Sequence, residues 1–183
     1  MRPCHTPVRE SVSQKRRKSS MEFTQGVRFD SLGLSPEIMR AIGQRRIEES
    51  TPVQAGCIPP MMEWRDVIAK APTGTGKTFA YGIPIVEHVE PENESVQAVI
   101  LAPTRELAIQ ITDEMRDLAT YKPGVRMVCL YGGAPIGRQI DALKKHPQIV
   151  VATPGRLSDH MKRRTVRVES AQTVVLDEAD RML

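Results

Sequence analysis

Short apolar runs alternate with helical patterns along most of this chain. The runs are rich in Val, Ile, Leu and Ala, and segments with apolar residues at a period of 3.6 separate them. A strand of a parallel sheet is buried on both faces, so it reads as a continuous apolar run. The pattern therefore predicts an α/β fold in which helices cover both faces of a parallel sheet. The expected strands are Asp66–Lys70, Gln97–Ala102, Arg126–Tyr131, Ile149–Ala152 and Thr173–Leu176.

Cap-and-proline signals mark the first two expected helices. Ser35-Pro36 precedes a helical pattern that runs to Ile42, and Thr51-Pro52 precedes a second one. A Ser or Thr side chain caps the first N–H groups of a helix, and proline fits the first turn. Later helices are expected over residues 79–86, 106–119, 135–145 and 155–162.

A glycine-rich loop stands between the first expected strand and the next helix. It reads Ala71-Pro72-Thr73-Gly74-Thr75-Gly76-Lys77-Thr78. Glycines let backbone N–H groups approach phosphate oxygens, and the helix N-terminus adds partial positive charge. Lys77 would reach the β- and γ-phosphates of a nucleotide, and the Thr78 hydroxyl would bind Mg²⁺. Ala71 stands where the strict pattern has glycine, and the alternative interpretation is a flexible turn that binds no ligand.

An acidic segment, Asp177-Glu178-Ala179-Asp180, follows the last expected strand. Ligands of open parallel sheets bind beyond the carboxyl ends of the strands, where the glycine-rich loop is also expected. Asp177 would bind Mg²⁺, and Glu178 would orient or deprotonate the attacking water. The alternative is an acidic helix start, which also favours Asp and Glu.

Five motifs in one order resemble those of the DEAD-box ATP-dependent RNA helicases. Two of the five are the glycine-rich loop and the acidic segment. The other three are Ala102-Pro103-Thr104-Arg105-Glu106-Leu107-Ala108, Gly132-Gly133 and Thr153-Pro154-Gly155-Arg156-Leu157. The resemblance runs from about Phe29 to Leu183. It implies the N-terminal RecA-like domain of an RNA helicase, with a P-loop, and with ATP and Mg²⁺ as cofactors.

The resemblance also implies contacts to adenine. Gln54 matches a glutamine that reads adenine, because one amide offers both a donor and an acceptor. Phe29 matches an isolated upstream aromatic residue. Arg46-Ile47 replaces the family's usual glycine–aromatic pair, and Ser50 replaces a usual proline. The implied ATP-binding residues are Phe29, Ile47, Gln54, Ala71, Pro72, Thr73, Gly74, Thr75, Gly76, Lys77 and Thr78.

A surface for the RNA backbone is implied as well. Its residues offer hydroxyls, guanidinium groups or unhindered N–H groups, which suit phosphate and carry no base information. Sequence-independent binding of single-stranded or duplex RNA is therefore expected. Arg105 and Arg156 have an alternative interpretation as partners in structural ion pairs, and Asp180 is implied to couple hydrolysis to unwinding. The implied RNA-binding residues are Pro103, Thr104, Arg105, Gly132, Gly133, Thr153, Pro154, Gly155 and Arg156.

Charge is distributed unevenly along the chain. Residues 121–167 carry ten Lys and Arg side chains against Asp141 and Asp159, so this half would attract phosphates. Residues 1–20 are basic and rich in Ser and Pro, which predicts a disordered tail. Met21 precedes the first segment with folding character, so the tail is alternatively an over-extended translation start.

Membrane and disulfide-rich classes are disfavoured. No apolar run approaches the roughly 18 residues of a transmembrane helix, and the first residues lack the apolar middle of a secretory signal. These features predict a soluble, cytoplasmic protein without membrane partners. The three cysteines, Cys4, Cys57 and Cys129, are too far apart to suggest a disulfide framework or a zinc site.

The resemblance implies that residues 21–183 are a motor domain truncated just after Asp180. The family's Ser-Ala-Thr segment, the last strands and the second RecA-like domain would be missing, so little activity is expected from this chain alone. A DNA helicase or another P-loop ATPase would share Lys77 and Asp177 but would not explain Gln54. A non-hydrolysing RNA- or partner-binding module is the other alternative, and phosphate release with saturating RNA separates it from a helicase.

Overall fold

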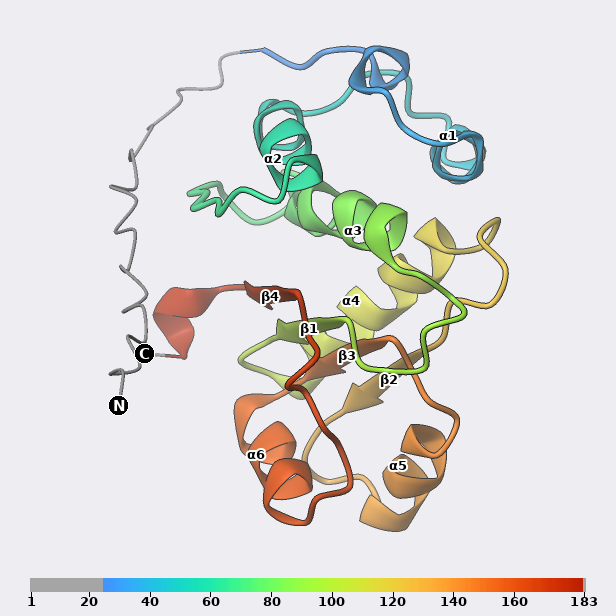
Figure 1. Cartoon of the computed structure of the whole chain (residues 1–183). Coiled ribbons are helices and arrows are strands. Elements are labelled where there is room, and N and C mark those ends of the chain that lie inside the picture. Colours follow the sequence, from blue (N-terminus) through green and yellow to red (C-terminus); the bar gives the residue numbers. More distant parts are fainter. Residues whose placement is uncertain (1–24, 183) are drawn as a thin grey trace, which may run out of the picture.

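A parallel sheet forms the centre of the molecule (Figure 1). The computed structural model describes residues 25–182, so the expected tail lies outside the described residues. Within them, the strands form a four-stranded sheet in the order β2-β3-β1-β4. The strands are β1 (Ala98–Leu101), β2 (Met127–Leu130), β3 (Ile149–Ala152) and β4 (Thr173–Leu176). Neighbouring strands are parallel and in register, which confirms the predicted α/β class.

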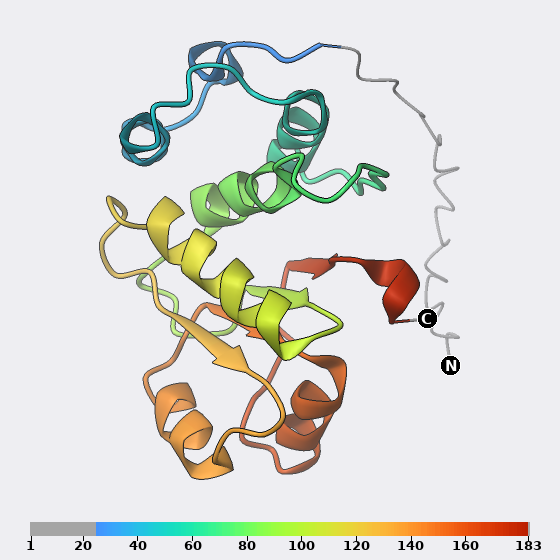
Figure 2. The ribbon, with the colours of Figure 1, turned by 180° about the vertical axis from the view of Figure 1, so that it is seen from behind.

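Helices cover both faces of this sheet (Figures 1 and 2). Helices α3 and α4 pack on one face, with α1 and α2 beyond them, and α5 and α6 cover the other face. Short 3₁₀ helices begin and end the described part, as η1 (Phe29–Leu32) and η2 (Ala179–Arg181). The α-helices are α1 (Pro36–Gln44), α2 (Pro52–Met62), α3 (Lys77–His88), α4 (Arg105–Leu118), α5 (Ile136–Leu143) and α6 (Pro154–Lys162).

The two faces of the sheet bury different side chains of the same strands. In β1, Ile100 is fully buried in the cluster with α3 and α4, whereas Val99 belongs to the cluster with α5 and α6. In β3, Val151 and Val150 divide in the same way. Successive side chains of a strand point to opposite faces, so a strand between two helical layers is apolar throughout. This is the physical origin of the uninterrupted apolar runs.

The predicted helix starts are confirmed by their caps. The Ser35 side chain accepts a hydrogen bond from the N–H of Ile38 at the start of α1. Thr51 and Gln54 form a reciprocal capping box at the start of α2. Each cap satisfies an N–H group that has no partner within the helix. The residues that define these boundaries are therefore local to each helix.

The prediction of a first strand at Asp66–Lys70 is wrong. Residues 65–72 have no regular secondary structure, and Ile68 is 96 % exposed. A strand exists only when a neighbour pairs with its backbone, and no described strand pairs with this segment. The outer edge of β4 is likewise unpaired within residues 25–182, and Val174 on it is 62 % exposed. The glycine-rich loop therefore enters α3 from an irregular segment.

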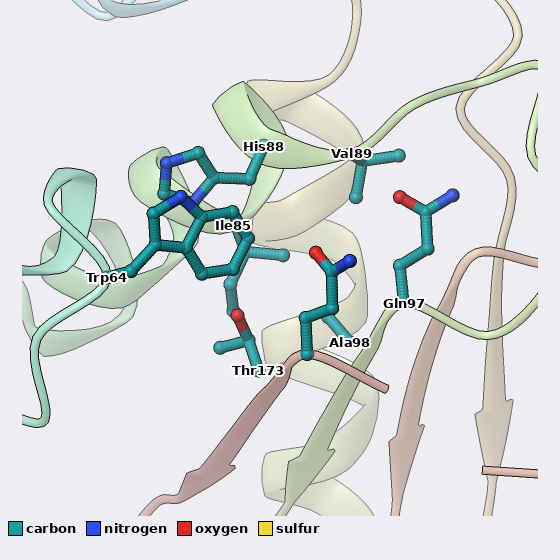
Figure 3. Close-up of a pocket in the computed structure, with 8 residues that line it drawn as sticks. Trp64, Ile85, His88, Val89, Gln97, Ala98 and Thr173 are labelled. Carbon is teal, nitrogen blue, oxygen red and sulfur yellow. The ribbon is translucent and has the colours of Figure 1, made fainter. Parts of the chain in front are cut away.

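A stacked aromatic pair lies at the amino ends of β1 and β4 (Figure 3). The rings of Trp64 and His88 are 4.0 Å apart between centroids and 11° from parallel. The pocket beside them has a volume of only about 10 Å³, which is roughly the space of one water molecule. It lies at the opposite end of the sheet from the five motifs and is too small for a nucleotide.

None of the helices within residues 25–182 is long and apolar enough to cross a membrane. Cys57 is buried against Val53 and Ala80, where it serves as a small core residue. Cys129 is half-buried on β2.

Candidate functional site

Two glycines of the glycine-rich loop have a backbone that other residues avoid. Gly74 and Gly76 both have a φ of 83°, in the left-handed region. A Cβ atom at Gly76 would also lie 2.3 Å from the side-chain Nε2 of Gln54. Gly76 is therefore required both for its backbone conformation and for the close approach of α2.

The loop presents donors at the start of α3. Lys77 and Thr78 are the first two residues of this helix, and no side chain caps it. The Nζ atom of Lys77 donates to the carbonyl of Ala71 over 3.0 Å, and the Thr75 hydroxyl donates to the carbonyl of Pro72 over 2.8 Å. Uncapped N–H groups, the helix dipole and an ammonium group thus meet in one place. This donor set fits the phosphate groups of a nucleotide.

Gln54 ties the start of α2 to the loop. Its Oε1 accepts from the N–H of Thr51 over 2.9 Å, and its Nε2 donates to the carbonyl of Gly76 over 3.1 Å. The side chain is buried, yet its amide keeps one further donor hydrogen and one further lone pair. A contact between Gln54 and adenine therefore stays a prediction, while its structural role in positioning the loop is visible.

The other implied adenine contacts differ in exposure. Phe29 is only 1 % exposed and packs in the core, so its ring offers no face to a ligand. Ile47 is 38 % exposed and follows Arg46, whose φ is 55°. Ser50, at the place of the usual proline, accepts from the N–H of Val27 over 3.0 Å and donates to its carbonyl over 2.8 Å. This serine therefore fastens the upstream segment to the start of α2.

Asp177, directly after β4, is held from both sides. Its Oδ2 accepts from the hydroxyl of Tyr81 over 3.0 Å, and its Oδ1 accepts from the N–H of Glu178 over 2.9 Å. The Thr78 side chain, three residues earlier on α3, is close enough to the Tyr81 hydroxyl to act on its pKa. Burial, followed by the charge of Asp177, raises the pKa of Tyr81, so its hydroxyl stays protonated and donates.

The two expected Mg²⁺ ligands, Thr78 and Asp177, therefore meet at Tyr81. Carboxylate and hydroxyl oxygens are ligands that Mg²⁺ prefers, so this pair fits the ion. Sequence reasoning missed Tyr81, although its spacing of three residues from Thr78 places both on one face of α3.

Glu178 is engaged in an ion pair. Its Oε2 lies 2.7 Å from Nη1 of Arg181, and its side chain is only 18 % exposed. Its φ of 49° is in the left-handed region, a strained conformation for a residue with a side chain. The carboxylate expected to orient water is thus held by η2, on which Asp180 is exposed.

The three remaining motifs lie together at the carboxyl ends of the strands. Leu101, Leu130 and Ala152, the last residues of β1, β2 and β3, are aligned in register. The segments that follow them carry the implied RNA-binding residues. Register between parallel strands therefore brings together segments that are distant in sequence.

Contacts connect these segments. The Arg105 guanidinium lies over the Tyr131 ring, 5.2 Å from its centroid. A Cβ atom at Gly133, where φ is 85°, would lie 3.7 Å from Nη1 of Arg105. Arg156 donates from Nη1 to the carbonyl of Ala134 over 3.2 Å. Within residues 25–182, neither arginine forms an ion pair, which disfavours the interpretation as structural salt bridges.

The two threonines of these segments differ in their contacts. The hydroxyl of Thr104 accepts from the N–H of Leu107 over 3.2 Å and caps α4. Thr153 stands at the same position before α6, yet its side chain forms no capping hydrogen bond. The start of α6 therefore keeps its first N–H groups uncapped, with Pro154 and Gly155 as its first residues.

Comparison with known proteins decides the family. The family model of the DEAD/DEAH box helicases matches residues 51–183. The chain belongs to this family. The matched segment includes both the glycine-rich loop and the acidic segment.

Similar proteins support the assignment to the DEAD/DEAH box helicases. The DEAD-box ATP-dependent RNA helicase CshA of Geobacillus kaustophilus is 56 % identical over 155 residues, which cover 85 % of this chain and 33 % of that protein. CshA of Bacillus subtilis is 51 % identical over 157 residues, covering 86 % of this chain and 32 % of that protein. The chain thus spans about a third of the length of these relatives.

A solved structure agrees with the fold. The DEAD box protein of the hyperthermophile Methanococcus jannaschii matches with a TM-score of 0.80 and 40 % identity. The match covers 86 % of this chain and 43 % of that chain. The expected RecA-like fold and the resemblance to DEAD-box helicases are confirmed.

Proposed function

We propose that this chain is the N-terminal motor domain of an ATP-dependent RNA helicase, which binds ATP with Mg²⁺ and the RNA backbone. The observation that carries the proposal is the meeting of Thr78 and Asp177 at Tyr81, beside the uncapped start of α3. The relatives CshA are named ATP-dependent RNA helicases, which supports the same activity.

The nucleotide roles follow from the donor and acceptor atoms. The first N–H groups of α3 and the ammonium group of Lys77 bind the β- and γ-phosphates once Lys77 leaves the carbonyl of Ala71. Thr78 and Asp177 hold Mg²⁺, which neutralises phosphate charge when bound. Glu178 orients water after its carboxylate separates from Arg181. Gln54 favours adenine through the remaining capacity of its amide.

The RNA roles follow from the edge of the sheet. Arg105 and Arg156 supply positive charge, and Gly132 and Gly133 supply backbone N–H groups from residues that have no side chain of their own. Such groups bind phosphates in any sequence, so we propose sequence-independent binding. The net positive charge of residues 121–167 adds a general attraction for phosphate, although Lys144 and Arg163 are paired with Asp141 and Asp159.

Full motor activity would require a second domain. The relatives are about three times as long as the matched segment, and we propose that a second RecA-like domain completes the site. Arginines supplied across such a site raise hydrolysis by about 10³–10⁵-fold in other nucleotidases. The chain alone should therefore hydrolyse ATP slowly and unwind no duplex.

Nucleotide binding provides the first test. Fluorescence titration with a labelled ATP analogue and Mg²⁺ should show saturable binding that Lys77→Ala weakens about tenfold or more, since an ammonium-to-phosphate contact is lost. Lys70→Ala is the matched control, because Lys70 is an exposed lysine outside the loop. Equal binding by Lys77→Ala and the unaltered chain would contradict the proposal.

A non-hydrolysing RNA-binding module is the second candidate function. The ion pair of Glu178 with Arg181 favours it, because that pair withdraws the carboxylate expected to orient water. Phosphate release should be measured at saturating RNA in a chimera that adds the rest of a CshA relative. RNA-stimulated release that Lys77→Ala abolishes supports the helicase, whereas RNA binding without release supports the second candidate.

A further inference from the structure

A buried hydrogen-bond network lies behind Arg156. His160, one turn later on α6, is completely buried. Its Nε2 lies 2.9 Å from Oε1 of Gln139, and its Nδ1 lies 2.8 Å from the hydroxyl of Thr165. Gln139 stands on α5 and is also buried. A polar contact between α5 and α6 thus replaces apolar packing at this point.

Geometry defines the protonation of this network. The Nε2 of Gln139 donates to the carbonyl of Tyr131 over 3.0 Å, which orients the amide so that Oε1 faces His160. Oε1 is only an acceptor, so the facing Nε2 of His160 carries the hydrogen. With a neutral ring, Nδ1 has no hydrogen and accepts from the hydroxyl of Thr165, which also lies 3.1 Å from a second acceptor, the carbonyl of His160.

The surrounding charges agree with a neutral imidazole. Burial, followed by the positive charge of Arg156, lowers the pKa of His160. Asp159 acts in the opposite direction and Arg163 adds to the lowering.

The same oxygen also holds Arg156. Nη1 of Arg156 donates to Oε1 of Gln139 over 3.3 Å and to the carbonyl of Ala134 over 3.2 Å. Within residues 25–182, no acceptor engages Nε or Nη2, so that edge of the guanidinium is left for a ligand. An arginine that is ordered in advance loses less side-chain entropy on binding.

We propose that Gln139 and His160 are positioning residues that hold Arg156 ready for an RNA phosphate. The inference rests on the proposed RNA-backbone function. His160 orients Oε1 of Gln139, which holds Nη1 of Arg156. The other end of the same amide holds the carbonyl of Tyr131, directly before Gly132-Gly133. A single side chain thus sets the relative placement of two RNA-binding segments.

The test is a double-mutant cycle between Gln139 and Arg156. Fluorescence anisotropy with a labelled oligouridine measures RNA affinity of the whole chain and of Gln139→Leu, Arg156→Ala and the double variant. We expect Gln139→Leu to weaken RNA binding by roughly three- to tenfold, as for one lost charge-assisted contact. In the Arg156→Ala background the same change should have little further effect, because Gln139 acts through Arg156.

Salt dependence separates positioning from general stability. The slope of log affinity against log salt should fall by about 0.7 in Gln139→Leu, as in Arg156→Ala, because one phosphate contact on a single strand is lost. Thr112→Val is the matched control, since Thr112 is also buried and donates to the carbonyl of Ala108 over 2.7 Å, a bond that involves neither Gln139 nor Arg156. It should leave RNA affinity and slope unchanged. Affinity for the labelled ATP analogue should remain unchanged in Gln139→Leu.

The outcomes are distinct. If Gln139→Leu lowers RNA affinity equally with and without Arg156, or leaves the salt slope unchanged, the positioning role is overturned. The proposed RNA surface would not be affected by that result. Unchanged RNA affinity in both Arg156→Ala and Arg105→Ala would overturn the proposed RNA surface and this inference with it. Should Gln139→Leu fail to fold, His160→Phe removes the donor that orients Gln139 and should show the same coupling to Arg156 with a smaller loss.

Discussion

The hydroxyl of Tyr81 donates a 3.0 Å hydrogen bond to Oδ2 of Asp177, although 96 positions separate the two residues. Tyr81 lies on the helix that begins with Lys77 and Thr78, and Asp177 follows the edge strand β4. This bond therefore joins the phosphate-binding start of α3 to the acidic segment. Because the bond is buried and its acceptor is charged, it is strong.

Removing this bond should weaken both the fold and the metal site. Tyr81→Phe keeps the ring but deletes the donor, so we expect the free energy of unfolding to fall by about 1.5–3 kcal/mol, the range for hydrogen bonds to charged groups. Urea unfolding measures it. More Mg²⁺ should also be needed for half-maximal binding of the ATP analogue.

Tyr121→Phe is the control for this prediction, because within residues 25–182 the Tyr121 hydroxyl bonds only to the exposed side chain of Gln44. Its effect should stay within about 0.5 kcal/mol. A similar loss in both variants would refute a special role for Tyr81.

Gly76→Ala should damage the glycine-rich loop. Its φ of 83° disfavours any Cβ, and that atom would lie 2.3 Å from Nε2 of Gln54. The backbone strain alone costs about 1–2 kcal/mol, and displacement of Gln54 should disturb nucleotide binding. Gly43→Ala is the control, because Gly43 lies in α1 with open space around its Cβ position. In thermal unfolding, the melting temperature of Gly76→Ala should be lower than that of the unaltered chain. The melting temperature of Gly43→Ala should be equal to it or higher.

Arg46→Gly should stabilise the protein. Arg46 follows the C-cap of α1 with a φ of 55°, a position where helices usually have glycine. Relief of this strain should raise the free energy of unfolding by about 0.5–1 kcal/mol. Arg46→Ala removes the same side chain but keeps the Cβ atom, so it should give no gain. Equal gains from both variants would show that the side chain, rather than the backbone, is unfavourable.

Fluorescence should report the titration of His88. Trp64, which stacks on His88, is the only tryptophan in the sequence. Burial lowers the pKa of His88, so emission should change with a midpoint below pH 6.5, the ordinary value. A lowered pKa means that the unfolded chain binds more protons, so this histidine's contribution to stability is present above pH 6.5 and is lost on acidification. His88→Leu should abolish the titration; its persistence would assign the change to another group.

Much of the architecture was determined by local sequence. The apolar runs predict strands β1 to β4, and Ser35 and Thr51 predict the starts of α1 and α2. These features are readable because burial on two faces and capping of N–H groups act over a few residues. The glycine-rich loop could be predicted for the same reason, because the left-handed backbone conformation at Gly76 is a local requirement for glycine.

Tertiary structure decided the features that depend on a distant partner. The apolar run at Val67 reads as a strand, yet no described strand pairs with it, and Ile68 is exposed. Phe29 reads as a nucleotide contact by resemblance, yet it is buried in the core. The bond between Tyr81 and Asp177 and the support of Arg156 by Gln139 join different elements. Local pattern does not encode such pairs, because register and helix packing determine which side chains meet only after the chain has folded.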